Sequence, residues 1–68
     1  MEGWIRTKQA ELNEILAKQV SGTKAHEFAS WVSVVRGIIK MVQAQGKVIK
    51  VQADRMEVAL KKLRKMVR

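Results

Sequence analysis

The stretch MVQAQGKVIKVQADRM (Met41–Met56) decides how this 68-residue chain folds. It places an apolar residue at every seventh position, but it has glutamines and a glycine where a packed helix usually has leucine or isoleucine. It is therefore either a break between two elements or an imperfect part of one long helix. A break makes the chain a self-contained domain, whereas a long helix makes it half of an assembly.

The segment before this stretch has the pattern of an amphipathic helix over residues 2–20. Its apolar residues follow one helical stripe with charged residues between them, at Ile5, Leu12, Ile15, Leu16 and Val20. Gly22 can then end a helix in the left-handed conformation, and Ser21 or Thr23 can cap the next one. We therefore expect a tight turn at residues 21–23, with a second helix directly after it.

A heptad frame that starts at Phe28 runs through the rest of the chain. All six of its first positions (a) are apolar, namely Phe28, Val35, Val42, Ile49, Met56 and Leu63. Its fourth positions (d) are Trp31, Ile38, Gln45, Gln52, Ala59 and Met66, and its fifth positions (e) are Val32, Ile39, Gly46, Ala53, Leu60 and Val67. Because a loop normally resets such a phase, we predict one continuous helix over residues 24–67, with a kink allowed near Gly46.

A three-helix domain is the alternative to this long helix. In that case Gly46 would end the second helix, and residues 47–52 would form a short extended piece. Asp54 would cap a third helix, with Glu57 three residues further on. The preserved heptad phase favours the continuous helix.

Folding the two predicted helices back on each other gives an all-α helical hairpin with a short first helix and a long second helix. The single domain would then span residues 1–68. The side chains expected to pack inside the hairpin are Ile5, Leu12, Leu16, Phe28, Trp31, Val35 and Ile38. These residues form the predicted core of one chain.

The second predicted helix extends past the first over residues 41–68, which is roughly 40 Å at ~1.5 Å per residue. Each apolar side chain left in water there would forgo about 1.5–3 kcal/mol of burial free energy. We therefore expect this overhang to pack on a second copy of the chain or on a larger protein. The residues expected at that contact are Val42, Gln45, Ile49, Gln52, Met56, Leu60, Leu63 and Met66.

The two glutamines suggest a role for the opening stretch in this packing. Gln45 and Gln52 occupy consecutive d positions just beyond the end of the first helix, where buried polar layers would restrict register and copy number. We interpret the stretch as the changeover from intrachain to interchain packing. Valines at flanking positions add a second apolar face, which fits a bundle or a ring-like assembly: Val34, Val48, Val51 and Val58.

The charge of the chain is concentrated in its second part. The net charge is +8, and residues 1–23 contain three basic and three acidic residues, so the whole excess lies in residues 24–68. Such a basic half indicates an acidic protein surface or nucleic acid as partner, although a solvated helix face has the same composition. The candidate contact residues are Lys40, Lys47, Lys50, Lys61, Lys62, Arg64, Lys65 and Arg68.

The sequence has no pattern that predicts catalysis. There is no cysteine, and His26 is the only histidine, so neither a thiolate site nor a histidine cluster is available. We predict no enzyme activity, no cofactor, no metal and no small-molecule substrate. No apolar run approaches the ~20 residues of a membrane span, and no signal-peptide pattern follows Met1, so we expect an intracellular, soluble protein without membrane contact.

The segment EFASWVSVVRGIIKMV (Glu27–Val42) resembles a group of very short helical-hairpin proteins that are encoded among the structural genes of tailed bacteriophages. Members have an aromatic residue, an alanine, a second aromatic three positions after the first, and then a small apolar stretch with glycine. The corresponding residues here are Phe28, Ala29, Trp31, Val35, Gly37 and Ile38. The resemblance covers about the first 42 residues, and the basic part beyond them is longer here than in that group.

Two functional classes follow from these observations. The resemblance implies a small virion or capsid-assembly component, located in the virion or in the host cytoplasm, that acts by helix packing. Its basic part would then face acidic protein or DNA. The alternative is a small oligomeric protein that binds DNA or RNA without sequence specificity, through salt-dependent phosphate contacts.

Overall fold

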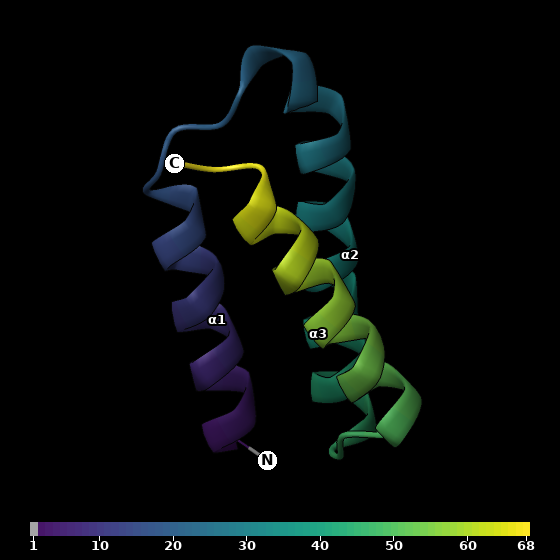
Figure 1. Cartoon of the computed structure of the whole chain (residues 1–68). Coiled ribbons are helices and arrows are strands. Elements are labelled where there is room, and N and C mark those ends of the chain that lie inside the picture. The colour runs from purple at the N-terminus through teal and green to yellow at the C-terminus, as the bar shows by residue number, and fades with distance from the viewer. Residues whose placement is uncertain (1) are drawn as a thin grey trace.

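The computed structural model describes residues 2–68 and contains three α-helices. They are α1 (Glu2–Leu16), α2 (Ala25–Gln45) and α3 (Lys50–Lys65), and a 3-10 turn over Gly22–Lys24 precedes α2. The chain reverses direction after α1 and again after α2, so α2 runs antiparallel to both of the other helices (Figure 1). The prediction of an all-α fold is confirmed.

The predicted continuous helix over residues 24–67 is wrong, because α2 ends at Gln45. Gly46 has φ 76° and ψ 10°, and its N–H donates to the carbonyl oxygen of Val42 at 2.9 Å. It is the only residue with positive φ in the described chain, and glycine adopts this conformation without a Cβ clash. The alternative reading of Gly46 is therefore the correct one, although the third helix begins at Lys50 rather than at Asp54.

Side chains from both helices hold the turn at residues 46–49 closed. Gln52 Nε2 donates to Gln45 Oε1 at 2.8 Å, and Gln52 Oε1 accepts from the backbone N–H of Ile49 at 3.4 Å. Ile49 is extended, with φ −97° and ψ 145°, and directly precedes α3. The two glutamines, which looked like flaws in a helix, are thus partners across a turn.

The connection between α1 and α2 is longer than predicted, because α1 ends at Leu16 instead of residue 20. The predicted turn at residues 21–23 lies within this connection. Its extended part pairs with the C-terminal end of the chain, since Arg68 N–H donates to the carbonyl oxygen of Gln19 at 3.0 Å. The two segments lie next to each other at one end of the bundle (Figure 1).

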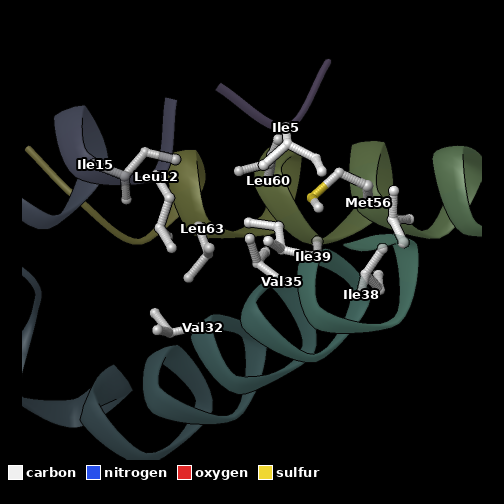
Figure 2. Packing of buried hydrophobic residues seen from close by; sticks show 12 residues of the cluster. Ile5, Leu12, Ile15, Val32, Val35, Ile38, Ile39, Met56, Leu60 and Leu63 are labelled. Atoms are coloured by element: carbon white, nitrogen blue, oxygen red, sulfur yellow. The ribbon is translucent and has the colours of Figure 1, made fainter. Parts of the chain in front are cut away.

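All three helices contribute to one hydrophobic core (Figure 2). Its members are Ile5, Leu12, Ile15, Val32, Val35, Ile38, Ile39, Val42, Met56, Ala59, Leu60 and Leu63. Because α3 folds back, Met56, Leu60 and Leu63 are fully buried within the chain, and the predicted overhang does not form. Burying side chains of this size contributes about 1.5–3 kcal/mol each. Association with a second copy or a larger protein stays a prediction.

Four of the seven predicted hairpin residues belong to this core, two pack against it, and Leu16 does neither. Ile5, Leu12, Val35 and Ile38 are buried, and Phe28 and Trp31 pack against the cluster while partly exposed. Leu16 is 38% exposed, because α1 ends there and Ile15 takes the inward position instead.

Candidate docking groove and basic surface

A shallow apolar groove of about 510 Å³ lies between α2 and α3. Trp31 and Val34, three residues apart, line it from α2, and Val51 and Val58, seven residues apart, line it from α3. Spacings of three and seven residues place side chains on the same face of a helix, so each helix contributes one short stripe. We call this feature the α2–α3 groove.

The floor of the α2–α3 groove is accessible. Val51 is 62% exposed and Val58 is 48% exposed, whereas Trp31 and Val34 are partly buried against the core. Met41 follows Val34 by seven residues on α2 and is also exposed, which lengthens the apolar stripe on that helix. A contiguous apolar surface of this kind is a feature of protein interaction sites.

Positive charge borders the groove. Lys62 Nζ lies 5.5 Å from the centroid of the Trp31 ring, within the range of a cation–π contact. Arg55 and Asp54 complete the lining, but the Asp54 carboxylate accepts from Lys50 Nζ at 3.4 Å. The acidic group is thereby partly neutralised, and the border keeps a net positive charge.

A separate ion-pair network joins α1 to α3. Lys8 Nζ lies 2.6 Å from Glu57 Oε1 and 3.3 Å from Glu11 Oε2, and Arg64 lies 3.8 Å from Glu11. Burial lowers the pKa of Lys8, but the hydrogen bonds to Glu57 and Glu11 outweigh this and raise the pKa above its ordinary value of 10.5. Sequence reasoning missed this network, since only the pair at positions 8 and 11 has a local helical spacing.

The predicted basic contact residues are all exposed, but they lie in several places. Lys62 borders the α2–α3 groove, whereas Lys65, together with Lys62, lines a shallow hollow near the start of α2. Arg64 faces Glu11, and Lys50 faces Asp54. Lys40 lies near α1, and Lys47 lies in the turn after α2. Lys61 lies on α3, and Arg68 lies beside the segment that follows α1.

A second hollow, between α1 and α2, is polar. Arg36 and Lys40 line it together with the amide side chains of Gln9, Asn13 and Gln43. Among the described residues that line this hollow there is no carboxylate, and the two charged ones are both cations.

The residues predicted to contact a second copy or partner are mostly inside the chain. Val42, Gln52, Met56, Leu60 and Leu63 are buried, and Met66 is partly buried. Gln45 and Ile49 are exposed, although Gln45 bonds to Gln52. Of the groove residues, sequence reasoning placed Trp31 in the core and noted the flanking valines only as a second apolar face.

Within residues 2–68, no three histidine, aspartate or glutamate side chains are grouped so that they could hold a metal ion. In the same part of the chain, no helix has the length and apolar character that crossing a membrane requires. Comparison of the chain with protein-family models, with curated proteins and with solved structures found no match.

Proposed function

We propose that this protein is a non-enzymatic assembly protein that binds an acidic helix of a larger protein in the α2–α3 groove. The observation that carries the proposal is an exposed apolar groove whose border is positively charged. Leaving Val51 and Val58 in water forgoes burial free energy that a docked partner would supply. An amphipathic helix binds such a groove through apolar residues spaced three, four and seven positions apart.

The charges near the groove favour an acidic partner over a second copy of this chain in that place. Lys62 and Arg55 offer donors for carboxylates at the border of the groove, and charge-assisted hydrogen bonds are stronger than neutral ones. A second copy would bring another net charge of +8 to the same surface. Positive charges facing each other would oppose that association.

The resemblance of Glu27–Val42 to helical-hairpin proteins from tailed-phage structural genes supports a virion setting for this activity. In that setting the larger partner is a virion or capsid-assembly protein, and the protein acts in the virion or in the host cytoplasm. Docking a helix and adding positive charge to an assembly requires no catalysis, cofactor or small-molecule substrate.

A designed peptide helix tests the groove directly. The probe is an acidic peptide of about 20 residues with leucine at helical spacing and glutamate between, and its matched control has the same composition in scrambled order. We expect a Kd of about 100 µM or tighter for the probe and binding at least about tenfold weaker for the control. Equal binding of both peptides, or no binding of either, would refute the docking proposal.

Two charge-matched variants locate the binding site. Val51→Glu with Val58→Glu places two carboxylates in the α2–α3 groove, and we expect it to weaken peptide binding at least about tenfold. Gln9→Glu with Gln43→Glu changes the net charge by the same amount but lies in the hollow between α1 and α2. We expect this control to bind the peptide nearly as well as the unchanged protein.

Non-specific nucleic-acid binding is the second candidate function, and the polar hollow between α1 and α2 favours it. Arg36 and Lys40 lie there with three amide side chains and, within residues 2–68, no lining carboxylate, an arrangement that suits a phosphate group. We expect affinity for a short DNA duplex to fall steeply between about 50 and about 200 mM salt if this function is correct. The Gln9→Glu with Gln43→Glu variant would then lose DNA binding while it keeps peptide binding.

A further inference from the structure

We infer that two copies of this chain can exchange α3, so that α2 and α3 of each copy join into one helix through residues 46–49. In the exchanged dimer, α3 of one copy packs against α1 and α2 of the other copy. It takes the place that the other copy's α3 has in the single chain. This inference concerns a second copy of the chain and is independent of the proposed function.

The heptad frame is the first observation that carries the exchange. The buried residues of α2 are Val32, Val35, Ile38, Ile39 and Val42, and those of α3 are Gln52, Met56, Ala59, Leu60 and Leu63. Every one of them occupies an a, d or e position of one uninterrupted frame. If the turn became helical, both sets would therefore lie on one continuous stripe, which is the requirement for packing along a second long helix.

The turn itself is the second observation. Only residues 46–49 separate α2 from α3, and the chain contains no proline that would prevent a helix there. Gly46 is the one described residue with positive φ, so the reversal of the chain depends on its left-handed conformation. Short hinge segments of this kind are where exchange of an identical element between copies occurs.

The exchanged dimer keeps the contacts between helices that the single chain has. Two long helices would run antiparallel, with α2 of one copy against α3 of the other, and Met56, Leu60 and Leu63 would be buried as they are now. Gln45 and Gln52 would lie near the two-fold axis, where Gln45 of one copy can bond to Gln52 of the other. Two α2–α3 grooves would be formed, so the dimer would be bivalent for a groove-binding partner.

Two glycine substitutions form a matched test. Leaving aside the adjacent residues and the local helix backbone, a Cβ added at Gly46 or at Gly37 meets no atom within 4 Å, so neither added methyl group clashes with another part of the chain. They differ in backbone, because Gly46 is left-handed and Gly37 is inside α2. Alanine disfavours the left-handed form and favours helix, so we expect Gly46→Ala to raise the dimerisation constant at least about 100-fold and Gly37→Ala to leave it unchanged.

Sedimentation equilibrium over a roughly hundredfold range of protein concentration measures this constant. Gly46→Asn serves as a second control, since asparagine tolerates the left-handed conformation, and it should stay close to the unchanged protein. A Gly46→Ala variant that remains monomeric throughout, or a Gly37→Ala variant that dimerises to the same extent, would overturn the inference. Because each copy carries +8, we also expect added salt to strengthen the dimer, whereas it weakens nucleic-acid binding.

Charge reversal distinguishes exchange from association of intact bundles. Lys8 of α1 pairs with Glu57 of α3, so Lys8→Glu and Glu57→Lys each place like charges at this contact within one chain. The two variants are mixed, each also carrying Gly46→Ala. Only a dimer with exchanged α3 then places a lysine opposite a glutamate at both contacts between positions 8 and 57. We expect the mixture to form a dimer with a higher Tm than either variant alone. A mixture that melts as the sum of its two components would contradict exchange.

Discussion

Lys8 Nζ on α1 donates a hydrogen bond to Glu57 Oε1 on α3 over 2.6 Å, across 49 positions of sequence. Lys8 is only 9% exposed, although lysine is among the residues least often buried. Its ammonium group also donates to Glu11 Oε2, so two carboxylates compensate for the burial of one cation. This contact ties the first helix to the last and is a marker for the folded arrangement of α3.

Replacing Lys8 with methionine should destabilise the protein. Methionine keeps the apolar stem but removes the ion pairs with Glu57 and Glu11, and we expect a loss of about 1–2 kcal/mol in the free energy of unfolding. Urea denaturation measures the change. Lys18→Met is the matched control, because Lys18 is exposed and makes no ion pair among the described residues. Equal effects of the two substitutions would show that the contact does not stabilise the fold.

The contribution of Lys8 should depend on pH. Folding raises its pKa above the ordinary value of 10.5, so its stabilisation is fully present below 10.5 and is lost as the pH rises through the folded value. We therefore expect the difference in unfolding free energy between the unchanged protein and Lys8→Met to be constant at neutral pH and to shrink in strongly alkaline solution. Urea titrations from about pH 8 to about pH 11.5 test this. A difference that stays constant over this range would contradict the raised pKa.

Gln52 should matter for the turn after α2 through both the nitrogen and the oxygen of its side-chain amide. Gln52→Leu leaves the Ile49 N–H and the Gln45 amide without this partner, and we expect a loss of about 1 kcal/mol in stability. Gln52→Glu keeps the acceptor for the Ile49 N–H but loses the Nε2 donor to Gln45 Oε1. A negative charge in the first turn of α3 offsets part of that loss, so the effect should be within about 0.5 kcal/mol. Thermal unfolding distinguishes the two. A more stable Gln52→Leu protein would mean that burial outweighs the hydrogen bonds.

The sequence interpretation also predicts that replacing both Gln45 and Gln52 with leucine alters the oligomeric state or the fit to a partner. In the folded chain these two residues bond to each other next to the hinge. Light scattering of the double variant against the unchanged protein measures the outcome. An unchanged oligomeric state would show that the two glutamines have no role in association.

Lys62 should contribute to partner binding because it lies over Trp31 at the border of the α2–α3 groove. We expect Lys62→Gln to weaken binding of the acidic peptide about 3- to 10-fold, the effect of losing one favourable charge contact. Lys47→Gln changes the net charge equally, but Lys47 lies in the turn after α2 and outside the lining of the groove. Tryptophan fluorescence and calorimetry measure both affinities, and equal losses would indicate a general charge effect in place of a local contact.

Periodicity alone predicted the helical class and the buried face of each helix. The a, d and e positions of the frame contain every buried residue of α2 and α3, from Val32 to Leu63. Helical spacing also predicted that Ile5 and Leu12 are core residues. These properties depend on local spacing, which a sequence displays directly.

Periodicity did not predict where the helix stops or which sides of α2 and α3 remain accessible. The four residues of the turn after α2 preserve the heptad phase, so the same pattern describes one long helix or two antiparallel ones. The choice depends on contacts between distant residues, above all the burial of Met56, Leu60 and Leu63 against α1 and α2. For the same reason, the sequence alone did not identify the valines of the α2–α3 groove as a candidate site. Sequence marks them as apolar, but only the tertiary packing of α3 determines that they face outward beside Trp31.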